Sequence, residues 1–193
     1  MEMVNPTTTP VAAELVALDA ALAANVRDAQ TLVAGLTDAQ GRWRPSTGSW
    51  SIAECLDHIA IANRVYLDAM TPSAVRALAD RRRRRRPALP GVIGRWFIST
   101  LEPPAKPLFS RKAPRLIEPR DAPPLADAMA AFLASQDDVR GFLQRYADID
   151  LAGVRFPNPF VRGLRFSLAT GLHVIAAHER RHLWQAWQVR GGM

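Results

Sequence analysis

Hydrophobic residues recur at spacings of three and four along four long stretches of the chain, which is typical of amphipathic helices. The stretches cover residues 11–36, 51–82, 125–146 and 167–189. Within the second stretch, Pro72 predicts a kink or a break before the helix resumes. No two stretches show the alternation of a convincing strand pair. We therefore expect an all-α protein, built as an antiparallel four-helix bundle.

A serine stands at the predicted start of two of these helices. Ser51 begins a Ser-Ile-Ala-Glu capping box, in which its hydroxyl and the Glu54 carboxylate satisfy free amide groups of the first turn. Ser167 stands in the same place before the last helix, which Gly191 and Gly192 end. These signals predict where the second and fourth helices begin.

Prolines concentrate between the second and third predicted helices. Nine of the fifteen prolines lie in residues 87–124, which excludes a long helix there. Apolar residues at 92–101 predict one short helix within this segment. We expect residues 81–124 to form a long proline-rich crossover and residues 147–165 a loop. Both belong to one domain of residues 1–193, whose first ten residues form a tail.

The composition agrees with a globular domain, because 48% of the residues are hydrophobic and 22% are charged. The net charge of +7 is concentrated, since Arg81 to Arg86 form an uninterrupted run of six arginines. Such a run can neutralise phosphates, but no aromatic residues interleave it to stack on bases. We expect a solvated loop here, and we do not expect nucleic acid as a partner.

The chain has one cysteine, Cys55, so it cannot form a disulfide within itself, which fits a reducing compartment. Its first residues show neither the basic region nor the apolar segment of a secretory signal. It also has no run of about 18 apolar residues that would span a bilayer. We expect a cytoplasmic protein with no membrane partner.

Three of the four histidines lie close together near the end of the sequence. His178 and His182 are four residues apart, so they lie about 40° apart on one helix face and can point at one ion. His173 is about half a turn out of phase with His182, and we expect it at the surface or in a supporting role. His58 lies near the start of the second helix, and facing helices of a bundle often assemble ligands from distant positions. The pattern favours a site for one divalent metal ion held by His58, His178 and His182.

Residues 178–182, HERRH, also match the HExxH motif of zincin proteases, in which the glutamate is a general base. Zincins usually take their third ligand from downstream, but no Asp, Glu, His or Cys follows His182. The protease is therefore the weaker alternative, and we expect Glu179 to be solvated. No catalytic base stands out, since Asp57 points about 100° away from His58 and is only a weak candidate for orienting it.

The sequence around these histidines resembles a known family. Residues 50–59, WSIAECLDHI, resemble the W-S-x-x-E-x-L-x-H signature of the DinB-like superfamily, and residues 178–185, HERRHLWQ, resemble its H-x-x-R/H-H-x-x-Q ending. Residues 156–163 look like its loop before the last helix, although relatives often carry a histidine where Asn158 stands. The resemblance does not extend to residues 81–124.

This resemblance implies a four-helix bundle whose three histidines, here His58, His178 and His182, hold a metal ion, usually nickel or zinc. Characterised relatives include thiol-dependent transferases and isomerases that use low-molecular-weight thiols. We therefore expect a metal-dependent thiol S-transferase or hydrolase that acts on a small molecule. The alternative is a non-catalytic, metal-stabilised bundle that serves as a binding or stress-response protein. We expect the five tryptophans to pack, with a homodimer through Trp184 and Trp187, since dimers are common among relatives.

Overall fold

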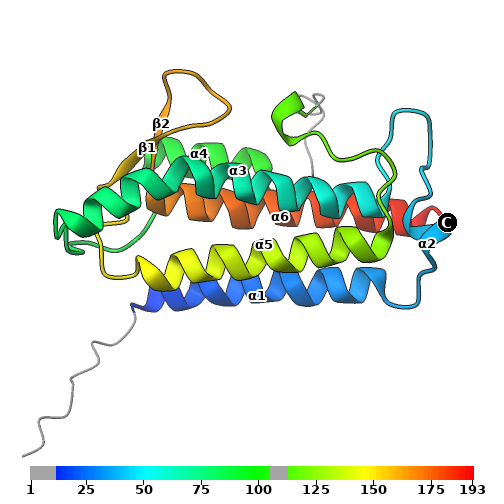
Figure 1. Ribbon diagram of the computed structural model, residues 1–193, viewed down its shortest axis with the longest axis horizontal. Helices are drawn as coiled ribbons and strands as arrows, with labels where there is room; N and C mark the ends of the chain where they lie inside the picture. The colour runs from blue at the N-terminus through cyan, green and yellow to red at the C-terminus, as the bar shows by residue number, and fades with distance from the viewer. Residues whose placement is uncertain (1–11, 105–112) are drawn as a thin grey trace, which may run out of the picture.

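The structure, a computed structural model that describes residues 12–104 and 113–193, is a bundle of four long helices (Figure 1). The long helices are α1 (Ala13–Val33), α3 (Ile52–Ala79), α5 (Leu125–Arg145) and α6 (Leu168–Gly191). The shorter elements are α2 (Asp38–Gly41), α4 (Val92–Leu101), the 3₁₀ helix η2 (Arg115–Ile117) and the strands β1 (Arg155–Pro157) and β2 (Arg165–Ser167). The prediction of an all-α bundle is confirmed, whereas the predicted tail of residues 1–10 lies outside the described residues.

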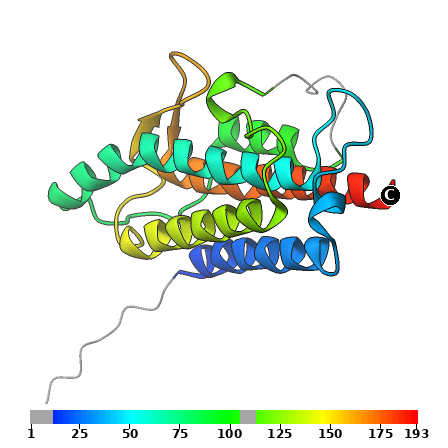
Figure 2. The same cartoon turned by 45° about the vertical axis from the view of Figure 1, so that its right-hand side comes forward.

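Two of the long helices run in each direction. Figures 1 and 2 show that α1 and α6 run one way and that α3 and α5 run the other way. α3 packs against α5 and α6, and α1 packs against the same two helices. The pairs α3–α6 and α1–α5 are antiparallel, as predicted, while α3 and α5 are parallel neighbours. Parallel neighbours need a long connection that returns the chain to its starting end, and the crossover after α3 is that connection.

The helix α3 is continuous through Pro72, so the predicted break is wrong. A proline inside a helix removes one backbone hydrogen bond and crowds the preceding turn. Here Met70, Ala74 and Ala77 on either side of the proline are buried in the core. Their packing against the other helices holds the backbone helical across the weak point.

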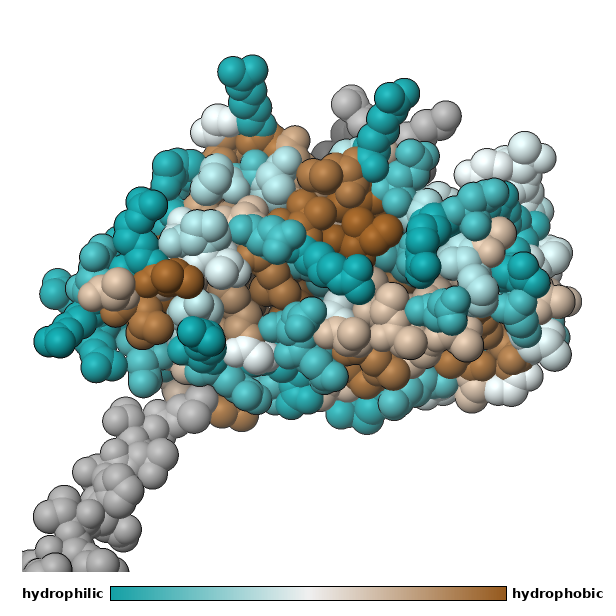
Figure 3. All heavy atoms as spheres, in the orientation of Figure 1, coloured by the Kyte–Doolittle hydropathy of each residue, from teal (hydrophilic) through white to brown (hydrophobic). Residues whose placement is uncertain are grey.

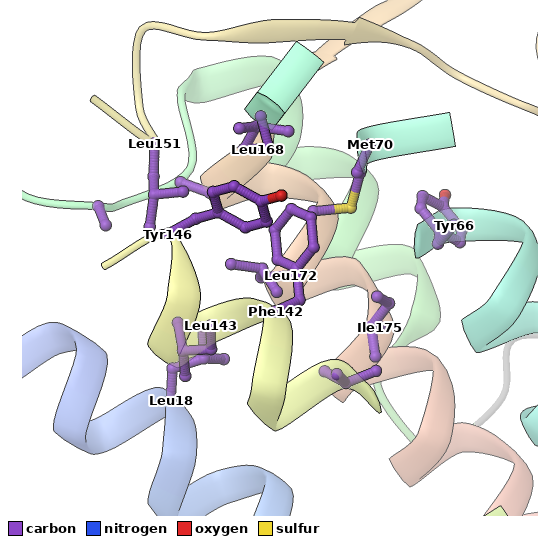
Figure 4. Close-up of a cluster of buried hydrophobic side chains, with 14 of the residues drawn as sticks. Leu18, Tyr66, Met70, Phe142, Leu143, Tyr146, Leu151, Leu168, Leu172 and Ile175 are labelled. Carbon is purple, nitrogen blue, oxygen red and sulfur yellow. The ribbon is translucent and has the colours of Figure 1, made fainter. Parts of the chain in front are cut away.

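Two groups of buried apolar side chains fill the bundle. Figure 4 shows part of the larger group, in which side chains from all four long helices and the loop after α5 meet. The labelled residues include Leu18, Met70, Phe142, Leu151 and Leu172. The second group joins the start of α3 to the end of α6, through Leu56, Ile59 and Leu183. This second group surrounds the part of α3 that carries His58.

The short helix predicted at residues 92–101 is confirmed as α4. α4 packs on α6, and its Gly94 lies so close to Thr170 that a Cβ atom there would stand 2.7 Å from the threonine side chain. Phe97 of α4 also contacts Phe166 of β2, with ring centroids 5.2 Å apart. The crossover therefore covers one side of α6.

The backbone of the arginine run is anchored, which corrects the prediction of a purely solvated loop. The Arg84 N–H donates to the Asp148 carbonyl, and the Asp150 N–H donates to the Arg82 carbonyl, each at 2.9 Å. The sequence predicted solvation from charge alone, and most of these side chains are indeed exposed. The backbone of the run forms an antiparallel β-bridge with the segment after α5, between Arg83 and Ile149.

The strands β1 and β2 form an antiparallel pair within the segment predicted to be loop, so the absence of a strand pair was a wrong prediction. Phe156 of β1 pairs with Phe166 of β2, and both side chains are buried. Each strand has three residues, which is too short for an alternating pattern to be recognised. Across the two described ranges, we find no helix with the length and apolar character needed to cross a membrane.

Candidate metal centre

The first turn of α3 positions His58. The Ser51 hydroxyl accepts a hydrogen bond from the Glu54 N–H at 3.2 Å, and the Ser51 N–H donates to the Glu54 carboxylate at 2.8 Å. This is the predicted capping box, and it fixes where the helix begins. His58 follows one turn later and is 1% exposed. The ring therefore lies inside the bundle, between α3 and α6.

Three histidine rings meet at this place. The ring centroids of His178 and His182 are 4.5 Å apart, and those rings lie 5.0 and 4.3 Å from the ring of His58. One nitrogen from each ring lies within 4.8 Å of the others. Among the described residues, this is the one cluster of three or more potential ligands that could hold a metal ion. The structure thus brings together the three histidines that the sequence singled out, which we call the histidine cluster.

Two of the rings are oriented by hydrogen bonds on their outer nitrogens. The Nδ1 of His58 lies 2.5 Å from the Ile117 carbonyl, to which Nδ1–H donates in the matching tautomer. The Nδ1 of His182 lies 3.0 Å from the Oε1 of Gln185, and it donates in the same way. Each bond leaves the lone pair on Nε2, the nitrogen on the far side of the ring. Metal-binding histidines are commonly held by such a bond on the other ring nitrogen.

The histidine cluster fits a metal ion in spacing. The Nε2 atoms of His58 and His178 lie 3.3 Å apart. Two imidazole nitrogens bound to one tetrahedral ion at about 2.0–2.1 Å would lie about 3.4 Å apart. The observed spacing therefore matches that expected for two ligands of one ion.

The cluster also fits a metal ion in charge. Burial lowers the pKa of His58 to about 4, against smaller opposing effects of the Ile117 hydrogen bond and the charge of Asp57. Burial, and then the neighbouring histidines, lower the pKa values of His178 and His182 well below the usual range. The rings are therefore neutral at pH 7, which is the form of histidine that binds metals.

The comparison with known families agrees with this geometry. A family model described as the DinB superfamily matches residues 21–186, a range that includes all three histidines. The chain belongs to the DinB superfamily. No curated protein and no solved structure gives a significant match to it. The resemblance recognised from the two histidine motifs is thereby confirmed, and the matched range extends across the proline-rich crossover.

Trp50 forms a wall of the histidine cluster in this DinB protein. Its ring centroid lies 4.6 Å from that of His58 and 5.7 Å from that of His182. The sequence predicts only packing for Trp50, and this contact with two of the histidines was missed. The available signal was its place in the W-S-x-x-E-x-L-x-H signature.

Glu179 faces away from the cluster into the bundle core, so its predicted solvation is wrong. Its Oε1 accepts hydrogen bonds from the side-chain amides of Asn63 (2.9 Å) and Gln136 (2.7 Å), and its Oε2 accepts one from Asn25 (2.7 Å). Burial raises its pKa, against the effect of these bonds. Because amides from α1, α3 and α5 occupy both oxygens, the zincin role of a free general base does not fit this residue. We call these four residues the glutamate cluster.

Asp57 acts on the site through the crossover and not through a direct contact with His58. It is buried, and it accepts hydrogen bonds from the Arg120 guanidinium at 2.9 and 2.6 Å and from the Arg120 N–H at 2.8 Å. Arg120 follows η2, which contains Ile117, the partner of the His58 ring. The ion pair therefore holds the crossover where its carbonyl can orient His58.

His173 and Cys55 take no part in the histidine cluster. Burial lowers the pKa of His173, which lies near the backbone of Ala88 on the crossover, and this residue is partly exposed. Cys55 is fully buried, and burial raises the pKa of its thiol. A buried neutral thiol is a poor nucleophile and a poor ligand.

Proposed function

We propose that this DinB protein is a metal-dependent enzyme in which His58, His178 and His182 hold one divalent ion, zinc or nickel. The observation that supports it is the convergence of three neutral imidazoles, two buried and that of His178 partly buried, whose ligand nitrogens lie within 4.8 Å of one another. Neutral nitrogen ligands suit zinc, nickel and related ions. In the chain that the structure describes, no carboxylate or thiol joins the three rings.

The ion would supply a coordination position that the protein leaves open, where a water or a thiol loses its proton near neutral pH. The chain contributes the rest of the site. The Ile117 carbonyl and Gln185 keep His58 and His182 in the ligating tautomer, and Trp50 excludes water from one side. The reaction we propose is attack of a low-molecular-weight thiolate on an electrophilic carbon of a second small molecule, which forms a C–S bond as a leaving group departs with its electron pair. Hydrolysis of a small molecule is the second candidate.

The thiol would be a separate small molecule, because the only cysteine of the chain is fully buried. A cytoplasmic location, where such thiols are abundant, remains our expectation. The homodimer also remains a proposal. Trp187, one of the two tryptophans expected in it, already packs on the core and donates to Asp28 at 3.0 Å.

Elemental analysis of the purified protein tests the site. We expect about one equivalent of zinc or nickel in the natural chain and in His173→Ala, a matched control on the same helix. We expect less than a tenth of an equivalent in His178→Ala. A natural chain reconstituted with each ion that retains none would overturn the metal site.

Activity is tested separately with the metal-loaded protein. A panel of low-molecular-weight thiols is mixed with a chromogenic electrophile, and a chromogenic ester tests hydrolysis. Turnover that needs both the thiol and His178 supports S-transfer, and ester cleavage without a thiol supports the hydrolase. Metal-dependent stabilisation without any turnover would favour the non-catalytic bundle, since an ion at this site ties α3 to α6.

A further inference from the structure

A second candidate binding site lies at the other end of α3. Arg76 is about 27 Å further along this helix than His58, at a rise of about 1.5 Å per residue. Figure 1 shows this end of α3 on the same side of the bundle as β1 and β2. Residues of α3, the arginine run and both strands line a hollow of about 320 Å³ in the surface there. Figure 3 shows hydrophilic side chains gathered at this end of the molecule. The hollow plays no part in the proposed metal chemistry.

Four arginines line this hollow, and they come from the end of α3, the arginine run and the two strands. They are Arg76 of α3, Arg82 of the arginine run, Arg155 of β1 and Arg165 of β2. Among residues 12–104 and 113–193, Asp80 is the one acidic residue that lines it. Four positive charges against one negative charge leave a local excess of +3, which favours an anion.

These four arginines lack the partners that many other arginines of the bundle have. Within residues 12–104 and 113–193, no carboxylate oxygen lies within 4 Å of their guanidinium nitrogens, whereas Arg120 and Arg140 form close ion pairs with Asp57 and Asp19. Arg155 and Arg165 each donate to the backbone carbonyl of the other, at 3.4 and 3.2 Å. These bonds hold the two guanidinium groups beside the strand pair, and each group keeps further N–H donors.

The wall of the hollow is built by the turn that contains Gly153. The Gly153 N–H donates to the side chain of Asp150 at 3.0 Å, and Asp150 also pairs with Arg86 at 3.5 Å. A Cβ atom on Gly153 would stand 2.1 Å from the Asp150 carboxylate. A side chain at this position would displace the Asp150 and Arg86 side chains from their present contact. Arg84 and Arg86 of the run are used in ion pairs with Glu14 and Asp150, so the run is not one uniform polycation.

We propose that this hollow binds a small phosphate-bearing anion, such as a phosphate monoester or a diphosphate. Planar guanidinium forks bind phosphate oxygens in pairs, and here four arginines line one concave space. This placement around a hollow favours a compact ligand over a nucleic-acid backbone, which would follow charges spread along a surface. The site is independent of the histidine cluster.

Calorimetric titration of the full chain with inorganic pyrophosphate, at pH 7.5 and constant ionic strength, tests the proposal. We expect saturable binding of one equivalent. The double variant Arg155→Gln/Arg165→Gln should weaken binding at least tenfold, and so should Arg76→Gln, which leaves the strand pair untouched. Asp80→Asn should bind several-fold more tightly, because the opposing carboxylate is gone.

Two control variants separate the hollow from general surface charge and from the histidine cluster. Arg64→Gln removes one exposed charge from the same helix outside the hollow, and it should change affinity less than twofold. His178→Ala should bind pyrophosphate as the natural chain does, because the anion does not act by chelating an ion at the histidine cluster. Loss of binding in His178→Ala, or an equal loss in Arg64→Gln, would overturn the site.

Two further results would also overturn the proposal. One is the absence of saturable binding at millimolar pyrophosphate. The other is binding of a 20-base-pair DNA duplex that is lost in Arg81→Gln/Arg83→Gln/Arg85→Gln and kept in Arg155→Gln/Arg165→Gln. That pattern would assign the positive charge to nucleic acid in place of a small anion.

Discussion

His178 and Glu179 are neighbours in the chain, yet they belong to two polar clusters of opposite character. In the glutamate cluster, three amides satisfy both oxygens of one buried carboxylate, so the charge at its centre has its partners within the protein. The histidine cluster is incomplete, because its Nε2 atoms face one another across a few ångströms and bring no opposite charge between them. The first cluster therefore needs no further group to satisfy its carboxylate, whereas the second has the spacing and free nitrogens for the ion that we propose.

The two clusters also depend on each other. Adjacent residues on a helix point about 100° apart, so fixing Glu179 toward α1, α3 and α5 fixes the rotation of α6. That rotation turns His178 and His182 toward His58. The glutamate cluster thus sets the geometry of the histidine cluster without contributing a ligand.

The largest effect is expected when Glu179 is replaced by alanine. Three buried amides would each lose a charged acceptor, and breaking this buried network should lower the free energy of unfolding by about 3–5 kcal/mol. Urea denaturation measures this loss, with Glu118→Ala as an exposed control that should change little. A loss below about 1 kcal/mol would show that Glu179 does not hold the bundle together.

Metal binding should give the next largest effect. At a free zinc or nickel concentration 100 times the dissociation constant, the metal should stabilise the fold by about 2.7 kcal/mol. Thermal unfolding with added metal and with a chelator measures this stabilisation. The melting temperature of His178→Ala should change with neither the metal nor the chelator. Equal stabilisation of the natural chain and His178→Ala would place the ion elsewhere.

Acid should destabilise the metal-free protein by a smaller amount. Histidines whose pKa is lowered by folding stabilise the fold above the unfolded value of about 6.5, and this contribution is lost as the pH falls toward the folded value. For His58, with a pKa of about 4 in the fold, the loss at pH 5.5 is about 1.4 kcal/mol. His178 and His182 act in the same direction.

This pH effect is measured by urea denaturation at pH 7.5 and 5.5. The window lies above the usual pKa values of carboxylates, so the acidic ion pairs contribute little there. The dependence should shrink in His58→Gln. A metal-free protein whose stability is unchanged between the two pH values would contradict neutral, buried histidines.

The smallest effect on stability is expected for Gln185→Leu. Gln185 orients His182 from the partly exposed side of α6, so the metal-free fold should lose less than about 0.5 kcal/mol. Metal affinity should nevertheless fall at least tenfold, since the ring loses the bond that fixes its tautomer. A competition assay with a chromophoric chelator measures the affinity, and Gln188→Leu, on the exposed face of α6, is the control. Unchanged affinity would mean that this bond does not orient the ligand.

The sequence was most informative where the structure depends on local spacing. The pair His178 and His182 follows from four-residue spacing, and the start of α3 follows from Ser51 and Glu54. The third histidine, His58, followed from its place on a second helix of the bundle and from the absence of a ligand after His182, and the family resemblance then implied the same residue. The Ile117 carbonyl could not be predicted, since its position depends on how an irregular, proline-rich segment packs.

Glu179 shows why burial was the hardest property to predict. A glutamate beside two arginines resembles a solvated residue, and its burial depends on partners from three other helices. One signal was available in the sequence. In α1, Asn25 lies in the apolar stripe between Leu22 and Ala29. In α3, Asn63 lies in the apolar stripe between Ile59 and Tyr66. Polar residues within such stripes indicate a buried polar group that they must satisfy.

Because Cys55 is buried, the folded chain should not react with sulfhydryl reagents. A colorimetric disulfide reagent should not react with the native protein, and it should report one equivalent only after denaturation. Consumption of a small thiol can therefore be followed directly in the presence of a large excess of the protein. The reagent labels Cys55 covalently only when the protein unfolds. Turnover, which consumes the small thiol, can therefore be distinguished from loss of the fold, which labels the protein.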